Sequence, residues 1–295
     1  MDLLEKYSYT PDQEKMGMAL QQLASNLDAF ESERVYKECF SMMDLTTLKT
    51  DDTPESVSKL VCKVNAFRES YPDWPLPASV CVYPNFAHLV AQERTQDYNV
   101  TAVSACFPTS QSFLEVKLKE CELAVEYGAD EIDIVLALNK FLAGDYDGAA
   151  EEIRQVRSCI DAVAARQNRT VHLKVILETG ILKTPEKIAR ASFLAMEAGA
   201  DFIKTSTGKV DVNATPAAAY VMCECIDVFY KKTGRKIGFK PAGGISSAAD
   251  ALCYYSIVSS ILGKDWLNKE FFRFGVSRVA NSILSAVEEK TVSYF

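Results

Sequence analysis

Histidine is nearly absent from this sequence, because only His88 and His172 occur in 295 residues. A zinc site made mainly of imidazoles, or a nucleophile activated by a histidine triad, therefore has almost no residues to use. A lysine amine can form an imine with a carbonyl carbon without such partners. If the protein acts on a carbonyl compound, we expect a lysine to be the reactive group.

Paired cysteines are missing as well. The nine cysteines are an odd number without a C-x-x-C spacing, and the closest two are Cys223 and Cys225. Together with the charged residues 1–6, this pattern favours reduced thiols in a cytoplasmic protein that has no signal peptide. No apolar run approaches the length of a membrane span, so we expect no membrane association.

The sequence has no excess of positive charge. Its 32 basic and 40 acidic residues give a net charge of −8, which argues against a general surface for nucleic acids. A local phosphate site is still compatible with this balance. The hydrophobic fraction of 48% is typical of globular proteins, and the length suits one large α/β domain.

The segment 201–209, with the sequence DFIKTSTGK, organises the chain. Helical patterns over 185–197 and 216–232 flank it, so it is expected to be the strand of a β/α unit. Lys204 lies in the middle of this strand and could reach water at the strand end. Alternatively it is desolvated, which lowers the pKa of an amine as a Schiff-base nucleophile requires.

A second segment favours the functional alternative. Residues 237–245, IGFKPAGGI, again form a strand pattern with a lysine, Lys240, followed by a glycine turn. If the two strands are parallel neighbours, Lys204 and Lys240 meet at the same carboxyl edge. A neighbouring ammonium lowers the pKa of an amine further, so two independent causes would act on Lys204.

A strand pattern followed by a helical pattern occurs eight times without an intervening linker. This predicts one (β/α)8 TIM barrel over residues 39–295, with its chemistry at the carboxyl ends of the strands. Residues 1–38 form an N-terminal helical extension, with helices near 11–25 and 28–38. We expect the extension to cap one end of the barrel, and packing on the body or on a partner subunit is the alternative. The expected strands are 39–44, 78–83, 100–107, 131–137, 171–178, 202–205, 237–240 and 271–274.

Alternation along the strands places charged side chains inside the barrel. A barrel interior built only for stability would contain Val, Ile and Leu, so buried charges indicate a functional site. Structural alternatives exist for some of them: Asp44 could cap a strand end, and Lys174 with Asp133 could be an ion pair. Cys81, also inward, could simply fill the core, and Glu178 could cap a turn. The inward charged residues are Asp44, Asp133, Lys174, Lys204 and Lys240.

Glycine-containing turns follow the last three expected strands, at 207–209, 243–246 and 275–278. Glycine lets backbone amides approach an anion, and each turn leads into the positive end of a helix dipole. TIM barrels commonly hold a phosphate after strands seven and eight. Lys209 and Arg278 could add charge. The three turns together predict a phosphate site.

These residues also carry a family resemblance. Eight motifs, in order and at matching spacing over residues 36–290, resemble those of deoxyribose-phosphate aldolases. The resemblance implies a class I aldolase on a (β/α)8 barrel, which splits 2-deoxy-D-ribose 5-phosphate into D-glyceraldehyde 3-phosphate and acetaldehyde without a metal or organic cofactor. A homo-oligomer is compatible with this interpretation. The motifs are 43–48, 80–84, 128–133, 174–180, 201–209, 213–216, 238–244 and 273–275.

The resemblance implies a role for each matched position. Lys204 corresponds to the Schiff-base lysine and Lys240 to the lysine that lowers its pKa. Asp133 corresponds to the carboxylate that moves protons through a water molecule, with Lys174 supporting it. Asp44 corresponds to a residue that binds sugar hydroxyls. The implied substrate-binding set is Asp44, Thr46, Cys81, Thr207, Gly208, Lys209, Gly243, Gly244, Ser246, Gly275 and Ser277.

Two departures from the family pattern limit the resemblance. Residues 136–140 differ from the common bacterial form, and Tyr294 is penultimate where many bacterial members end in a tyrosine that assists proton transfer. Two alternatives to this aldolase remain open: another Schiff-base aldolase or a transaldolase that acts on a different phosphosugar, and a non-catalytic protein that keeps the barrel.

Overall fold

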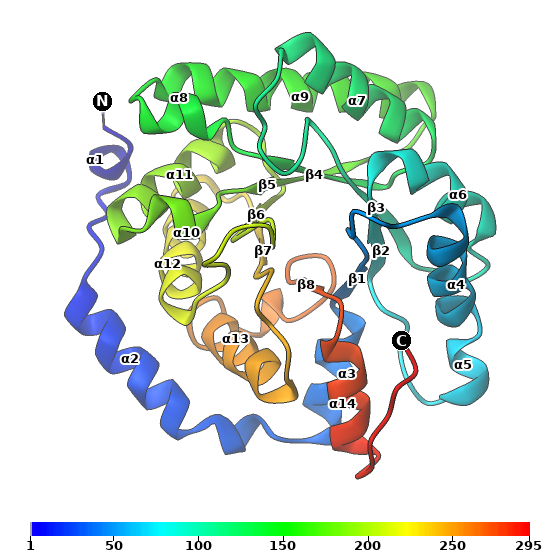
Figure 1. Ribbon diagram of the computed structural model, residues 1–295. Coiled ribbons are helices and arrows are strands. Elements are labelled where there is room, and N and C mark those ends of the chain that lie inside the picture. The colour runs from blue at the N-terminus through cyan, green and yellow to red at the C-terminus, as the bar shows by residue number, and fades with distance from the viewer. Residues whose placement is uncertain (1) are drawn as a thin grey trace.

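A computed structural model describes residues 2–295 and shows a single eight-stranded parallel sheet curled into a barrel (Figure 1). The strand order is β7-β6-β5-β4-β3-β2-β1-β8, and bridges from Phe239 to Phe272 and from Ala242 to Gly275 bring β7 against the segment of β8. The predicted TIM barrel is thereby confirmed. The strands are β1 (Met43–Thr46), β2 (Ser79–Val82), β3 (Asn99–Val103), β4 (Glu131–Val135), β5 (His172–Ile176), β6 (Phe202–Lys204), β7 (Gly238–Lys240) and β8 (Phe274–Val276).

Helices surround the barrel in Figure 1 and alternate with the strands along the chain. Three of them begin as their sequences suggest: Thr53, Thr184 and Thr215 each accept a hydrogen bond from a first-turn amide, and a proline follows each threonine. The helices are α1 (Leu3–Tyr7), α2 (Gln13–Ser25), η1 (Leu27–Phe30), α3 (Glu33–Ser41), α4 (Pro54–Asn65), α5 (Phe67–Ser70), η2 (Pro84–Phe86), α6 (Ala87–Glu93), α7 (Leu114–Glu126), α8 (Leu138–Leu142), α9 (Tyr146–Arg166), α10 (Thr179–Leu182), α11 (Pro185–Glu197), α12 (Pro216–Thr233), α13 (Ala248–Ile261), η3 (Lys264–Trp266) and α14 (Val279–Val287).

The first and last strands begin later than expected. Helix α3 continues to Ser41, so β1 starts only at Met43, and it also crosses residue 38, where the extension was expected to end. Strand β8 starts at Phe274 rather than 271. The residues before β1 belong to helix α3. Before β8, by contrast, Phe272 already pairs with Phe239 of β7 through an isolated bridge, so the segment joins the sheet without forming a regular strand there. A strand pattern alone does not distinguish these two cases.

The apolar core lies mainly between the strands and the helices. Alternate residues such as Ile132, Ile134, Leu173 and Val175 face this layer and are at most 3% exposed. A second, small apolar cluster of Leu48, Cys81 and Val103 is separate from it, with Tyr83 and Phe107 packed alongside. Leu48 follows the end of β1, so this cluster lies toward the carboxyl ends of the strands, which we call the mouth of the barrel.

The N-terminal extension lies along the side of the barrel and does not cap an end. Helix α1 contacts α11, and α2 crosses α12 and α13 (Figure 1). Tyr7 stacks on Phe193 with ring centroids 4.2 Å apart, and its hydroxyl donates to Glu197. Lys15 forms an ion pair with Glu224 on α12. The expectation of a cap was wrong, because the apolar and charged groups of the extension match partners on the outer faces of these helices.

The C-terminal tail is held on the side opposite the mouth. The Tyr294 hydroxyl donates to the carbonyl of Lys63, in the last turn of α4, at 2.9 Å. The side chain of Asn281 accepts hydrogen bonds from the amides of Tyr294 and Phe295. Because helices run antiparallel to the strands in this fold, the end of α4 lies at the amino ends of the strands.

Candidate active site

Lys204 and Lys240 are neighbours at the same level of the barrel. They are paired residues in the parallel register of β6 and β7, as the sequence predicts for adjacent strands. The ammonium groups share one carboxylate, because Oδ2 of Asp133 lies 2.8 Å from the Nζ atom of each lysine. Alternation brings these side chains together from three strands, since each points to the inner face of its own strand.

Asp133 also contacts a third lysine from the neighbouring strand. Its Oδ1 atom lies 3.0 Å from Nζ of Lys174, whose residue is its direct partner in the β4–β5 register. Lys174 further contacts Glu131, and lies 3.8 Å from Asp44. On the opposite wall, Oδ2 of Asp44 is 2.5 Å from Nζ of Lys240. The five predicted inward charges therefore meet in one network.

Burial and charge set the proton affinities in this network. Burial lowers the pKa of Lys204 from its ordinary value, and repulsion by Lys240 adds to this, although Asp133 opposes both. Burial acts in the same direction on Lys240, but Asp133 and Asp44 outweigh it and raise its pKa. Burial opposes ionisation of Asp133, yet the three lysines hold its pKa well below the usual range. Of the two neighbouring lysines, Lys204 is the one that releases its proton more readily.

Lys204 is also the lysine that a substrate can reach. Its side chain keeps 4% of its surface exposed, whereas those of Lys174 and Lys240 keep none. Cys81 is fully buried nearby, and burial raises the pKa of its thiol. Thr46 is the direct register partner of Cys81, and its hydroxyl donates to the carbonyl of Asp44. These two residues form part of the wall around the lysines.

The turn after β7 presents backbone amides at the mouth. Gly243 and Gly244 have φ angles of 78° and 77°, which side-chain-bearing residues rarely adopt. Within residues 2–295, the amides of these glycines have no hydrogen-bond acceptor. Ser246 differs, because its amide and hydroxyl both donate to Asp250 in the first turn of α13. Within residues 243–247, the amides without an acceptor are therefore those of Gly243, Gly244 and Ile245.

The turn after β6 is held by a buried acid. Both oxygens of Glu178 accept hydrogen bonds from Thr207, one from its amide at 3.1 Å and one from its hydroxyl at 2.6 Å. The hydroxyl of Thr207 in turn accepts from the amide of Lys209. The ammonium of Lys209 donates to the carbonyl of Leu48 across the mouth. The hydroxyl of Thr207 therefore shapes the turn around Gly208.

The turn after β8 approaches the lysines closely. A Cβ atom on Gly275 would lie 2.6 Å from Cβ of Ala242 and 3.1 Å from Cε of Lys240. No side chain fits there without moving the β7 turn, which explains the glycine. Ser277, two residues further on, is exposed at the start of α14. The structure thus brings the predicted glycine turns to the same edge as Lys204 and Lys240.

Comparison with known proteins shows which family the chain belongs to. A family model described as DeoC/LacD family aldolase matches residues 39–253. The chain belongs to this family. It is similar to the deoxyribose-phosphate aldolase of Homo sapiens, with 43% identity over 255 residues that cover 82% of this chain and 77% of that protein. It is also similar to a putative deoxyribose-phosphate aldolase of Caenorhabditis elegans, with 38% identity over 282 residues, 94% of this chain and 89% of that protein.

Solved structures agree on the fold of this aldolase family. A crystal structure of a putative deoxyribose-phosphate aldolase from Toxoplasma gondii superposes with a TM-score of 0.73 and 24% identity, covering 87% of this chain and 98% of that one. A structure described as QR15, an aldolase, gives a TM-score of 0.65 and 27% identity, covering 85% and 95%. The barrel and its surrounding helices are therefore shared with both.

Two charged residues of the cluster in this aldolase were not predicted from the sequence. Arg273 is fully buried, and its guanidinium contacts both Asp44 and Glu131. Glu131 lies two residues before Asp133 on β4 and therefore shares its inner face, but nothing in the sequence indicated its partner. An arginine in the apolar segment 271–274 was the available signal, because such a residue must be compensated if it is buried.

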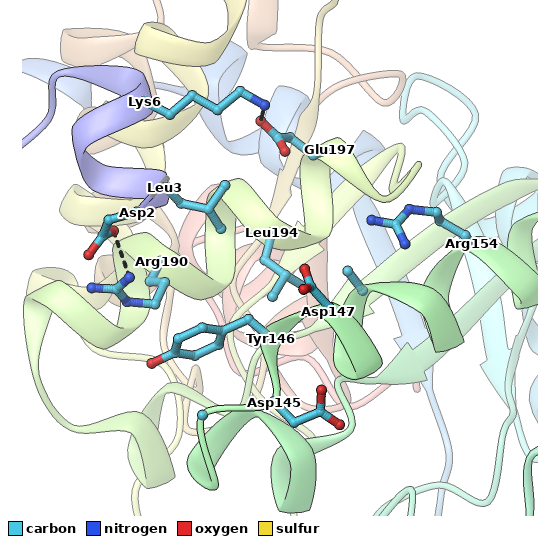
Figure 2. Close-up of a pocket in the computed structure, with 12 residues that line it drawn as sticks. Asp2, Leu3, Lys6, Asp145, Tyr146, Asp147, Arg154, Arg190, Leu194 and Glu197 are labelled. Atoms are coloured by element: carbon cyan, nitrogen blue, oxygen red, sulfur yellow. Dashed lines mark hydrogen bonds and ion pairs between the residues drawn. The ribbon is translucent and has the colours of Figure 1, made fainter.

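A pocket of about 580 Å³ lies elsewhere, between α1, α11 and the start of α9 (Figure 2). There Arg190 pairs with Asp2 at 2.6 Å, and its guanidinium lies over the ring of Tyr146. The pocket is lined by groups of both charge signs and by none of the predicted site residues. Among the residues described, no group of histidine, cysteine and acidic side chains suits a metal ion, and no helix is long and apolar enough to cross a membrane.

Proposed function

We propose that the chain is a class I aldolase that cleaves 2-deoxy-D-ribose 5-phosphate into D-glyceraldehyde 3-phosphate and acetaldehyde. The observation that carries this function is the buried pair of lysines around Asp133, in which Lys204 has a lowered pKa and an exposed edge. A free amine in that place can attack an aldehyde carbon and form an imine. The relatives bear the name of this activity.

The chemistry follows from the electron demand of the protonated imine. Lys204 attacks C1 of the open-chain sugar, and loss of water from the resulting carbinolamine gives an iminium. A base then removes the proton of the C3 hydroxyl, the C2–C3 bond breaks, and its electron pair moves into the iminium to give an enamine. D-Glyceraldehyde 3-phosphate leaves. Protonation of the enamine at C2 and hydrolysis of the imine release acetaldehyde and free Lys204.

Asp133 is suited to the proton transfers in these steps. Its Oδ2 atom is 2.8 Å from the nitrogen of Lys204, within reach of the carbinolamine either directly or through one water molecule. Lys174 and Lys240 hold Asp133 ionised by contact with both of its oxygens. We assign Asp44 to hydroxyl binding, in keeping with its contact with Lys240 next to the nucleophile.

The phosphate would bind to the glycine turns. Gly243 and Gly244 present free amides at the mouth, next to the amino end of α13, and amides of this kind favour anions. Lys209, whose ammonium contacts only a backbone carbonyl among the described residues, can turn toward the same anion. The hydroxyls of Thr207 and Ser246 already donate to Glu178 and Asp250, so these residues would hold the turns in place and would not bind the phosphate with their hydroxyls. We further propose a cytoplasmic location, consistent with nine free cysteines.

Trapping of the imine tests this proposal. Borohydride with acetaldehyde should label Lys204, and 2-deoxy-D-ribose 5-phosphate should be turned over. Lys204→Leu should abolish both the label and turnover. Labelling with dihydroxyacetone phosphate in place of acetaldehyde would indicate a different Schiff-base aldolase. Label on Lys174 or Lys240 would contradict the assignment of the nucleophile.

A further inference from the structure

The side chains that form ion pairs inside the barrel are unequal in number, with four cations and three carboxylates. Every member takes part in an ion pair with another member of the group. An uncompensated charge in the interior is strongly destabilising, so one of the four cations should be neutral. Arginine does not lose its proton in proteins, and the neutral member must therefore be a lysine. The four cations are Lys174, Lys204, Lys240 and Arg273, and the three carboxylates are Asp44, Glu131 and Asp133.

The contacts single out Lys204 as that lysine. Lys174 pairs with Glu131 and Asp133 and lies 3.8 Å from Asp44. Lys240 pairs with Asp44 at 2.5 Å and with Asp133 at 2.8 Å. Among the residues described, Lys204 pairs with Asp133 alone, which it shares with both other lysines. It is the least compensated cation of the network.

Arg273 is the fourth cation, which makes the cations outnumber the carboxylates. It contacts two of the carboxylates and none of the three lysines of the network. Its Nη2 atom donates to Oε1 of Glu131 at 2.6 Å, and its Nη1 atom donates to Oδ1 of Asp44 at 2.6 Å. Asp44 and Glu131 are thereby partly neutralised by Arg273, and less of their negative charge remains to compensate the lysines. Without Arg273, three lysines would face three carboxylates, and all of the lysines could keep their protons.

We propose that Arg273 is a positioning residue: by binding Glu131 and Asp44 it sets the charge balance of the network so that Lys204 is the lysine left as a free amine. The proposal rests on the proposed function, since it concerns the nucleophile of that reaction. Its physical basis is that removal of a nearby positive charge favours the protonated form of an amine, and removal of a negative charge disfavours it.

Other groups also face Lys204 and stay unchanged in the test. Asp133 approaches it from β4 and Lys240 from β7. Cys81 faces it from β2, with the pKa of its thiol raised by burial. Glu178 lies near it at the end of β5 and is engaged with Thr207. A difference in pH dependence between variants of Arg273 and Glu131 would therefore report the changed charge of the network around Lys204.

The test compares Arg273→Met, Glu131→Gln and the double variant. The readout is the pH dependence of Lys204 labelling by acetaldehyde with cyanoborohydride, together with kcat/KM for the phosphorylated sugar. Arg273→Met should move the acid limb of both profiles upward by about one pH unit, which is a tenfold loss of free amine below that limb. Glu131→Gln should move it downward. The double variant, which removes one charge of each sign, should return it close to the wild-type position.

A matched control removes a buried cation outside the barrel. Lys117 on α7 is 3% exposed and pairs with Glu152 at 2.6 Å, so Lys117→Met should lower stability without moving the acid limb. If Arg273→Met does not fold, the proposal is still tested by the downward shift in Glu131→Gln and by the return toward the wild-type profile in the double variant. Unshifted profiles with uniformly lower rates would overturn the proposal. Absence of label on wild-type Lys204 would instead contradict the proposed function.

Discussion

The ammonium of Lys240 lies 2.5 Å from Oδ2 of Asp44, so the cation beside Lys204 is itself held by a carboxylate. This pairing changes how two adjacent lysines act on one another. Lys240 keeps its proton because Asp44 and Asp133 raise its pKa above that of an ordinary lysine. Part of its repulsion toward Lys204 is offset by the same carboxylates. Burial therefore contributes more than repulsion to the lowered pKa of Lys204.

Replacement of Lys240 by methionine tests how much the charge of Lys240 contributes to the lowered pKa of Lys204. Lys240→Met keeps much of the side-chain volume and removes the charge, and it leaves Asp133 free to bind Lys204 more strongly. Both changes raise the pKa of Lys204, so the acid limb of kcat/KM should move to higher pH, at about 1.4 kcal/mol per unit. Activity should fall at neutral pH and partly recover in alkaline buffer. A variant equally inactive at every pH would show that Lys240 instead contacts substrate or transfers protons.

Charge at the β7 turn should affect phosphate binding selectively. Gly244 has no atom within 4 Å of the place where a Cβ would lie, so Gly244→Glu brings a carboxylate to the proposed anion site. We expect KM for 2-deoxy-D-ribose 5-phosphate to rise at least about tenfold, or 1.4 kcal/mol, with a much smaller change for unphosphorylated 2-deoxyribose. Gly244→Asn is the control, because asparagine tolerates a positive φ and carries no charge. Equal losses with both sugars would place the phosphate elsewhere.

Tyr294 should contribute to stability and not to proton transfer. Its hydroxyl donates to Lys63 on the side of the barrel away from the lysines. Tyr294→Phe removes one hydrogen bond of about 1 kcal/mol, which lowers Tm by about 2 °C for a chain of this size. Steady-state kinetics should give a kcat within about twofold of wild type. A large drop in kcat with an unchanged Tm would mean that the tail reaches the mouth during turnover.

The buried carboxylates predict a threshold in acid stability. Burial opposes the ionisation of Glu131 and Asp133, but the surrounding cations hold their pKa values well below the ordinary 4.5 and 3.8. Because the folded-state values lie below the unfolded-state ones, this stabilisation is fully present above about pH 5 and is lost as the pH falls below about 4. Thermal unfolding followed by circular dichroism should show a steep fall of Tm below that threshold.

Glu131→Gln provides the comparison for this prediction. The variant lacks one of the carboxylates whose protonation drives the loss, and it leaves Arg273 with Asp44 as its remaining acidic partner. Its Tm should be lower near neutral pH and should depend less steeply on pH below about 4. The same steepness in both proteins would indicate that other carboxylates control acid unfolding.

The fold and the lysines at its centre could be predicted from the sequence. Eight β/α units specify a barrel because a parallel sheet must bury both faces. Period-two alternation then sends Lys204 and Lys240 inward, and the observed register pairs them directly. Helix starts at Thr53 and Thr184 were also readable, since a hydroxyl before a proline at the first helical position is a local signal. All of these features depend on neighbours in the chain.

Only the tertiary structure decided which charges compensate one another. Arg273 meets Asp44 across 229 positions of sequence and Glu131 across 142, and no local pattern encodes such a pairing. The attachment of α1 to α11 and of Tyr294 to Lys63 is of the same kind. Closing the barrel brings these groups together, and the cost of leaving a buried charge unpaired then selects their arrangement. The sequence supplied the lysines, and the closed barrel supplied the surroundings that leave Lys204 the least compensated.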